Sequence, residues 1–309
     1  MVKKIGIIGF SEGNGHPFSF SSIVNGYDDS KLKLSGWPVI YDYVTRRDPS
    51  EFGFHDVEIS YAWTQTKELT ELLCKACKIP YALNQYDEMV GLVDGVIIAR
   101  DDYDTHYEIA KVFLDNNIPV FIDKPLSLDI NELKYFKPYL ETGMLMSCSG
   151  MRYARELDQL RQDISLFEYG EFKMIRGTVI NSWEKYGIHL IDAVLSLSAF
   201  VPESVQYIDS ISDSMVIKMK DGTCVQIDSL GSIPKAFHID VYGSKKITRV
   251  EIEDNFTMFR RTLWHFFHSI DSRTPEVPAD ITINAMRILI AGKLSKKEKR
   301  RVFIDEFSI

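Results

Sequence analysis

Short apolar runs alternate with helix-period segments over the first 125 residues of the chain. The apolar runs predict strands, and the segments between them predict helices. Strands that are apolar on both faces and separated by helices are typical of a parallel, doubly wound sheet. The predicted strands span residues 4–10, 57–63, 93–99 and 119–122, and the predicted helices span residues 20–25, 67–77 and 105–116.

The pattern changes beyond residue 126, where apolar and polar residues alternate within runs separated by Asp221-Gly222, Gly231 and Gly243. This alternation predicts an antiparallel sheet with one covered face. We therefore predict an α/β protein with one domain over residues 1–125 and a second over residues 126–309. In the second domain, strands are expected at residues 172–180, 214–219, 224–229, 237–242 and 247–252, and helices at 153–167, 187–199, 256–272 and 281–294.

Residues 28–56 separate the first predicted helix from the second predicted strand and are rich in Gly, Pro and aromatic residues. This segment is too long for a simple connection, so we predict an insertion that folds over the edge of the first domain. Its residues do not distinguish a lid from a subunit contact.

Composition narrows the class of protein. The chain has 309 residues, 45% of them hydrophobic and 26% charged, with a formal net charge of −8. These values are typical of a folded soluble protein, and the acidic balance disfavours nucleic acid or an anionic membrane as the main partner. The basic cluster at residues 296–301 is interpreted as a solvated helix end. The longest apolar run, residues 188–201, is shorter than the ~20 residues of a membrane span.

The cysteines and the N-terminal sequence favour a cytoplasmic protein. Four cysteines are few for a secreted disulfide framework, and the N-terminal residues lack the pattern of a signal peptide. Cys74 and Cys77 form a C-x-x-C, but they fall in a predicted helix without a second pair or a nearby histidine. We predict two helix thiols there and no metal site.

A glycine-rich loop follows the first predicted strand. The strand ends with Gly6-Ile7-Ile8-Gly9 ahead of a predicted helix, where backbone N–H groups and the helix dipole favour a dinucleotide pyrophosphate. The G-x-G-x-x-G spacing is altered, because Ser11 and Asn14 occupy the second and third glycine positions. Alone, the loop fits either an altered nucleotide turn or an ordinary glycine-rich turn. The second strand ends without an acidic residue at Thr64-Gln65, which does not separate NAD from NADP.

A lysine stands at the carboxyl end of the predicted parallel sheet. Lys124 follows the apolar strand and Asp123 directly, and ligands bind at this edge in such folds. Pro125 restricts the backbone just beyond it. A ligand-binding ammonium and a solvated strand-end lysine are the two interpretations.

A histidine lies in a helix-like segment of the second half, Gly187-Ile188-His189-Leu190-Ile191-Asp192. On an α-helix, Lys185 and His189 share one face, and Asp192 follows His189 by three residues, so all three can meet in one cleft. A histidine packed in the core is the alternative interpretation.

Together, these motifs resemble the glucose-fructose oxidoreductase/inositol dehydrogenase (Gfo/Idh/MocA) family. The resemblance rests on the glycine-rich first turn, the Asp123-Lys124-Pro125 corner and the G-x-H-x-x-D helix at residues 187–192. Residues 94–99 with His106, and residues 169–172, also resemble the family's third strand and the start of its second domain. The similarity runs from about Lys3 to Asp192 and continues in the order of elements beyond.

The resemblance implies a Rossmann dinucleotide-binding domain and a C-terminal α/β domain whose open, largely antiparallel sheet often mediates oligomers. It implies an oxidoreductase that uses NAD or NADP on a secondary alcohol of a sugar, cyclitol or related substrate. Lys124 and His189 are implied to be catalytic, with the ammonium bonding the alcohol oxygen and the imidazole taking its proton. The expected assembly is a cytoplasmic homo-oligomer, a dimer or tetramer, with no nucleic-acid or membrane partner.

Further residues are expected to line the two binding sites. Trp183 and Tyr186 fit stacking on a sugar ring, although core packing explains them as well. The residues expected to contact the cofactor are Gly9, Ser11, Gly13, Asn14, Thr64, Ala99, Arg100, Asp101, His106, Asp123 and Lys124. Those expected to contact the substrate are Arg152, Trp183, Lys185, Tyr186 and Asp192.

The chain departs from the family pattern at Lys185, because family members usually carry an aspartate four residues before the site histidine. A second ammonium near Lys124 makes both groups harder to charge unless an anion lies between them. We therefore hypothesise a substrate with a carboxylate or phosphate, such as an acidic or nucleotide-linked sugar. The same departure, with the altered glycine loop, fits an alternative: a catalytically inactive Rossmann protein that binds a nucleotide as a sensor or scaffold. Retention of both Lys124 and His189 favours the enzyme.

Overall fold

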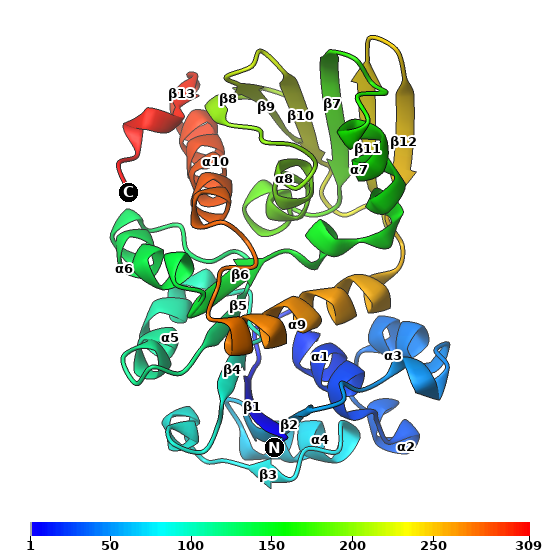
Figure 1. The fold of residues 1–309 in the computed structure, drawn as a ribbon, viewed down its shortest axis with the longest axis vertical. Coiled ribbons are helices and arrows are strands. Elements are labelled where there is room, and N and C mark those ends of the chain that lie inside the picture. The colour runs from blue at the N-terminus through cyan, green and yellow to red at the C-terminus, as the bar shows by residue number, and fades with distance from the viewer. Residues whose placement is uncertain (1) are drawn as a thin grey trace. The chain divides into compact units, whose positions relative to one another are not determined.

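The computed structural model describes residues 2–309, which form two compact units (Figure 1). The first unit contains the chain up to residue 127, residues 135–147 and residues 259–278. The second contains residues 128–134, 148–258 and 279–309. The predicted boundary at residue 125 lies close to the end of the first segment, but the chain returns to the first unit twice.

The first unit is built on a six-stranded sheet in the order β3-β2-β1-β4-β5-β6. The pairings of β1 with β2 and β4, of β2 with β3, and of β4 with β5 are all parallel, which confirms the predicted Rossmann-type sheet. The order changes direction between β1 and β4, the switch point at which such sheets bind ligands. The strands are β1 (Lys3–Ile8), β2 (Val57–Trp63), β3 (Tyr81–Ala82), β4 (Gly95–Ile98), β5 (Val120–Asp123) and β6 (Leu145–Cys148).

Helices pack against this sheet because its strands are apolar on both faces. In β1, Ile5, Ile7 and Ile8 are fully buried. A Cβ on Gly95 would lie 2.7 Å from Ile270 Cδ1, so the later helix α9 packs directly on β4 and its end belongs to the first unit. The helices are α1 (His16–Asn25), α4 (Lys67–Ala76), α5 (His106–Leu114), α6 (Ile130–Glu141) and α9 (Asn255–Ser272), with 3₁₀ turns at Tyr86–Met89 and Tyr103–Thr105.

The insertion at residues 28–56 folds into short helices, α2 (Asp29–Leu32) and α3 (Pro38–Thr45), and a 3₁₀ turn at Pro49–Glu51. Leu32 and Val44 are fully buried, which anchors both helices in the first unit. Tyr43 Oη donates a 2.5 Å hydrogen bond to Ser19 Oγ on α1. The insertion is therefore fixed against α1.

The second unit is built on a seven-stranded sheet in the order β12-β11-β7-β10-β9-β8-β13. β7 and β10 are parallel, while β10–β9, β11–β12, β11–β7, β13–β8 and β8–β9 are antiparallel, which confirms a largely antiparallel second sheet. A Cβ on Gly177 of β7 would lie 2.8 Å from Leu190 Cδ1, so helix α8 covers one face closely. The strands are β7 (Phe172–Val179), β8 (Pro202–Ile208), β9 (Asp213–Met219), β10 (Cys224–Ser229), β11 (Phe237–Gly243), β12 (Ile247–Glu251) and β13 (Val302–Phe303).

Two predicted helices of the second unit are shorter than expected. The segment predicted to be helical from residue 153 becomes an α-helix only at Asp158, because Ala154, with ψ 128°, leaves the helical conformation between the 3₁₀ turns at Gly150–Tyr153 and Arg155–Leu157. A π-helix at Trp183–Gly187 precedes α8. The helices are α7 (Asp158–Ser165), α8 (Ile188–Leu195) and α10 (Ala279–Glu298), with 3₁₀ turns at Gly150–Tyr153, Arg155–Leu157 and Ile304–Glu306.

The two thiols of the C-x-x-C lie on and just after α4, and both are buried. Burial raises the pKa of Cys74 and of Cys77 to about 12, so both stay protonated near neutral pH. Thiols in this state are poor nucleophiles and poor metal ligands. Within residues 2–309, none of the helices combines the length and hydrophobicity that a bilayer crossing requires.

Candidate nucleotide and substrate sites

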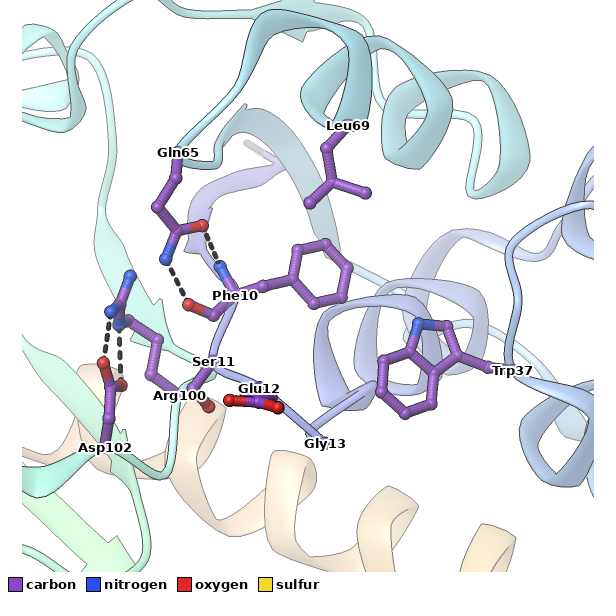
Figure 2. Close-up of a pocket in the computed structure, with 9 residues that line it drawn as sticks. All are labelled: Phe10, Ser11, Glu12, Gly13, Trp37, Gln65, Leu69, Arg100 and Asp102. Atoms are coloured by element: carbon purple, nitrogen blue, oxygen red, sulfur yellow. Dashed lines mark hydrogen bonds and ion pairs between the residues drawn. The ribbon is translucent and has the colours of Figure 1, made fainter.

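The loop after β1 is a tight turn. Asn14 N–H donates to Ser11 O at 3.1 Å, and Gly13 has a φ of +80° with open space where a Cβ would be. Phe10 N–H donates to Gln65 Oε1 at 2.6 Å, and Phe10 O accepts a hydrogen bond from Gln65 Nε2 (Figure 2). The side chain that follows β2 is therefore used to hold the glycine loop.

Lys124 lies just beyond the carboxyl end of β5 with only 4% of its surface exposed. Its Nζ is 3.7 Å from Asp101 Oδ2, and Asp101 Oδ1 accepts a 2.6 Å hydrogen bond from Ser11 Oγ. Asp101 N–H donates to the same Ser11 Oγ at 2.9 Å. The serine at the second glycine position thus ties the loop to the carboxylate that pairs with Lys124.

Asp123, the last residue of β5, is a buried carboxylate. Its Oδ2 lies 2.6 Å from His16 Nδ1 and accepts a 3.0 Å bond from Asn14 Nδ2, while Oδ1 accepts the Lys124 N–H at 3.0 Å. Burial acts to raise the pKa of Asp123, but the charge and hydrogen bond of His16, the charge of Lys124 and the hydrogen bond of Asn14 outweigh it and lower the pKa to about 2. The ionised carboxylate fixes Asn14, the residue at the third glycine position, beside β5.

A cavity of about 420 Å³ lies beside this loop, within the first unit (Figure 2). Its size is within the ~300–1,000 Å³ of small-molecule sites, and its place beside the β1/β4 switch point fits the adenosine side of a dinucleotide. Arg100 donates to Asp102 through both Nε, at 2.9 Å, and NH2. The lining residues are Phe10, Ser11, Glu12, Gly13, Trp37, Gln65, Leu69, Arg100 and Asp102.

The start of α1 differs from an ordinary phosphate cradle. His16 N–H already donates to Asn14 Oδ1 at 2.8 Å, and Pro17 has no N–H to offer. Gly9 serves packing, since a Cβ there would lie 2.4 Å from Pro17 Cγ. Residues 11–13 of the loop line the cavity instead. The site thus fits a dinucleotide, with the altered loop in place of the helix start.

Three of the predicted cofactor residues are buried and contact other parts of the first unit. Thr64 Oγ1 lies 2.8 Å from Thr70 Oγ1, and Ala99 N–H donates to Ile8 O at 2.8 Å. His106 is fully buried, with Nδ1 3.0 Å from Leu126 O and Nε2 3.2 Å from Arg100 O. Burial lowers the pKa of His106, which favours the neutral ring. These residues support the segments that line the cavity.

In the second unit, His189 lies in the first turn of α8, with Nδ1 2.7 Å from Ser149 Oγ. Ser149 follows β6, and its hydroxyl also accepts the Met151 N–H at 3.1 Å. The hydroxyl is therefore held in place by the backbone and in turn fixes one nitrogen of the imidazole.

Asp192 and Arg152 form a buried ion pair close to this histidine. Asp192 Oδ1 accepts from Arg152 NH1 at 2.7 Å, and Oδ2 accepts the Ser149 N–H at 2.7 Å. Burial acts to lower the pKa of Arg152, but the Asp192 carboxylate outweighs it, and the pKa is raised. Both groups were expected to contact substrate; the structure pairs them with each other and joins them to His189 through Ser149.

The π-helix at residues 183–187 alters the expected helix face. The spacing predicted that Lys185 and His189 share one face of an α-helix. A π-turn holds more residues than an α-turn, so the two residues do not lie on one uninterrupted α-helical face. The wide turn is accompanied by a bulky tryptophan packed on a glycine: a Cβ on Gly187 would lie 2.8 Å from Trp183 Cε3. Trp183 is fully buried, and its Nε1–H donates to Leu289 O at 3.1 Å. Its ring therefore packs in the core of the second unit.

Aromatic rings flank His189 in the second unit. The Tyr186 ring centroid is 5.2 Å from that of the imidazole, and the Phe237 ring is 6.3 Å from it. Lys185 is exposed on the turn that carries Tyr186. Lys235 Nζ lies 6.0 Å from the Phe237 ring centroid. The surroundings of His189 thus combine apolar rings with two lysines on neighbouring segments.

Several residues of both sites escaped the sequence analysis: Ser149, Phe237, Glu12 and Trp37. Ser149 had a usable signal, because it is a polar residue directly after an apolar strand. Trp37 had none, because predicting that the insertion covers the domain edge does not place its individual side chains. Gln65, which stands where an acidic residue would bind the ribose, is bonded to Phe10 in the structure.

Residues 43–143 match the model of a family described as an oxidoreductase family with an NAD-binding Rossmann fold, Gfo/Idh/MocA. The matched segment contains β2, β4, β5 and the Lys124 corner, and it begins after the altered glycine loop. The match confirms the predicted resemblance and the expectation of an NAD-binding oxidoreductase domain. Among curated proteins, none matches the sequence.

Solved structures share the fold over nearly the whole chain. Myo-inositol 2-dehydrogenase from Lactobacillus plantarum superposes with a TM-score of 0.78 at 16% identity, covering 98% of this chain and 99% of that one. Scyllo-inositol dehydrogenase from Lactobacillus casei, with bound NAD(H) and scyllo-inositol, gives 0.77 at 14% identity, covering 99% and 100%. A probable dehydrogenase from Thermotoga maritima gives 0.74 at 16% identity, covering 99% and 100%. These similarities confirm the predicted α/β fold.

Proposed function

From the match to the Gfo/Idh/MocA family, we propose that this protein is an NAD(P)-dependent oxidoreductase acting on a secondary alcohol of a sugar-like substrate. One observation carries the proposal: the buried ammonium of Lys124 lies at the carboxyl end of β5 and is tied through Asp101 to Ser11. Ser11 lines the cavity that fits a nucleotide. A buried cation at this edge of a Rossmann sheet, linked to the nucleotide loop, suits a reacting oxygen.

The chemistry divides between two side chains. A bound nicotinamide supplies the acceptor for the hydride that leaves the carbinol carbon. The alcohol oxygen loses its proton to His189, and the C–O bond becomes a carbonyl. Lys124 donates a hydrogen bond to that oxygen and stabilises the negative charge that develops on it. In the tautomer whose Nδ1–H donates to Ser149 Oγ, Nε2 of His189 is the nitrogen that accepts the proton.

The substrate is further proposed to carry a carboxylate or phosphate, as in an acidic or nucleotide-linked sugar. Lys185 stands where the family usually has an aspartate, and it is exposed on the turn beside Tyr186. Lys235 adds a second cation beside Phe237. An anionic substrate group is the natural partner of these two ammonium groups.

The proposed assembly is a cytoplasmic homo-oligomer formed through the second sheet. Its strands carry cross-strand ion pairs whose arginines are exposed, such as Arg176 NH2 with Asp228 Oδ2 at 2.9 Å and Arg249 Nε with Asp240 Oδ1 at 2.6 Å. Size-exclusion chromatography with light scattering measures the subunit number directly.

The test of the function is binding followed by turnover. Purified protein is titrated with NADH and NADPH by fluorescence, then assayed against cyclitols, neutral sugars, uronic acids, sugar phosphates and nucleotide sugars. We expect nicotinamide oxidation or reduction with at least one polyol, strongest among the anionic members. Tight nicotinamide binding without turnover on the whole panel overturns the proposal and favours a sensor. A nicotinamide that stays bound through turnover favours a third reaction class instead, elimination or epimerisation of the sugar by transient oxidation.

A further inference from the structure

We propose that the insertion at residues 28–56 forms part of the nucleotide site, with Trp37 packing against the base and Glu12 selecting an adenosine ribose without a 2′-phosphate. The proposal rests on the proposed function for the identity of the ligand as NAD(H). It concerns the cavity within the first unit alone, whose lining includes both residues. The insertion and the glycine loop then bind the adenosine ribose and base, whereas in other Rossmann sites an acidic residue at the end of β2 binds the ribose.

Trp37 contributes to an apolar wall of this cavity. Its ring is parallel to that of Phe10, with an interplanar angle of 3° and centroids 6.4 Å apart. Leu69, from α4, completes the apolar part of the lining, and Figure 2 shows the three side chains on one side of the loop. Aromatic faces bind nucleobases by stacking, whichever base is offered. The wall therefore suits a purine ring.

The position of Trp37 is fixed before any ligand arrives. A Cβ on Gly15 would lie 2.4 Å from Trp37 Cδ2 and 2.6 Å from Ile40 Cδ1, so the glycine allows the insertion to touch the loop. Ile40 is buried in α3, and Tyr43 on the same helix bonds Ser19 of α1. A preorganised ring loses little conformational freedom on binding, which favours a binding role.

Glu12 supplies the acidic group that the end of β2 lacks. Gln65, at that end, is bonded to Phe10, whereas the Glu12 carboxylate is exposed and, among residues 2–309, has no hydrogen-bonding or ion-pair partner. A free carboxylate in the lining can accept hydrogen bonds from the two ribose hydroxyls. Glu12 thus takes the place of the missing β2 carboxylate.

The charge of the lining selects against a 2′-phosphate. The cavity has two carboxylates, Glu12 and Asp102, and one guanidinium, Arg100, which gives a net charge of 1 − 2 = −1. Arg100 is bonded to Asp102 through two nitrogens, so it is already neutralised. A 2′-phosphate adds a charge of about −1.5 to −2. It would be repelled by Glu12, and the lining offers no cation outside the Arg100–Asp102 pair to neutralise it. The site therefore prefers NAD(H) to NADP(H).

The test uses fragments of the cofactor. Calorimetry measures the affinity of the full-length protein for 5′-AMP and for adenosine 2′,5′-bisphosphate. Trp37→Ala is expected to weaken 5′-AMP binding about tenfold, while Trp37→Phe, which keeps an aromatic face, changes it less than about threefold. Val39→Ala, at an exposed residue of the same insertion, is the matched control and leaves affinity unchanged.

Glu12→Gln gives a second, independent readout. Wild-type protein is expected to bind 5′-AMP at least about tenfold more tightly than the 2′,5′-bisphosphate, and Glu12→Gln narrows that ratio severalfold. Because Glu12 is exposed, its substitution leaves the melting temperature unchanged. The affinity ratio measured with Glu12→Gln therefore tests the proposal even if Trp37→Ala fails to fold. Unchanged 5′-AMP affinity in folded Trp37→Ala, or tighter binding of the bisphosphate to wild type, overturns the proposal. Selective 5′-AMP binding without turnover of any polyol contradicts the proposed function alone.

Discussion

Ser149 Oγ lies 2.7 Å from His189 Nδ1, and the Ser149 N–H donates to Asp192 Oδ2 at 2.7 Å. One serine after β6 therefore links the imidazole to the buried pair of Asp192 and Arg152. The hydroxyl holds Nδ1 and orients the ring, which is the task of a positioning residue next to a general base.

Removing this hydroxyl is expected to reduce the rate more than substrate binding. Ser149→Ala lowers kcat about 10- to 100-fold, part of the 10²–10⁴-fold that a well-placed base contributes, while KM changes less than about twofold. The pH profile of kcat also moves, because the ring loses a hydrogen-bonding partner, and Ser149→Thr restores both. An unchanged kcat and pH profile in Ser149→Ala would show that the contact is only structural.

Asp123 is expected to control acid stability. Its pKa is lowered in the folded protein to about 2, against ~3.9 when unfolded, so its contribution is fully present above pH ~4 and is lost as the pH falls through 2. At ~1.4 kcal/mol per pKa unit, the difference between ~3.9 and about 2 corresponds to a loss of about 3 kcal/mol. Urea unfolding of wild type and Asp123→Asn at pH 7, 4 and 2 measures it. Identical acid dependence in the two proteins would contradict the role assigned to His16, Asn14 and Lys124.

Much of the fold could be predicted from the sequence because its strands have uninterrupted local patterns. β2 and β10 begin and end at the predicted residues, 57–63 and 224–229. α1 begins at His16 instead of residue 20, because Asn14 accepts the His16 N–H and Pro17 suits a first turn. The start of α1 is set by the conformation of the loop, and the periodic pattern of hydrophobic residues carries no information about it.

Other features depend on contacts between distant segments. β3 and β13 have two residues each, too few for any periodic pattern. The return of residues 259–278 to the first unit depends on packing such as that of Ile270 over Gly95. Ser149 and His189 are 40 residues apart, and their contact brings together the start of the 3₁₀ turn at Gly150–Tyr153 and the first turn of α8. Sequence spacing identified His189 and Lys124 as candidates but not the side chains that hold them.

Lys185 tests the proposed substrate class. Lys185→Ala is expected to raise KM for an acidic sugar about tenfold and leave KM for a neutral cyclitol unchanged, because it removes one ion pair with the substrate. Lys185→Asp is expected to raise the KM for the acidic sugar further, because the new carboxylate repels the anionic substrate. Lys173→Ala, at an exposed lysine of the same unit, is the control. If neither Lys185 variant changes KM for any acidic substrate, Lys185 is only surface charge.

Trp183 is expected to affect stability instead of substrate binding. Trp183→Phe removes the hydrogen bond to Leu289 O and leaves a void beside Gly292, where a Cβ would lie 2.5 Å from the indole. Together these changes cost about 2 kcal/mol of the free energy of unfolding. Denaturant unfolding and KM are measured on the same preparation. A raised KM with unchanged stability would place the ring at the substrate.

The central claim is that Lys124 and His189 serve one reaction, and a double-mutant cycle on turnover tests it most directly. With the polyol that the panel identifies, Lys124→Met and His189→Asn are each expected to lower kcat/KM about 100-fold or more. The double variant should be little worse than either, since groups that act as a unit are not additive. Lys111→Met, at a partly exposed lysine of α5, controls for the loss of charge. Near-wild-type turnover in either single variant, or losses that multiply fully in the double variant, would contradict the account.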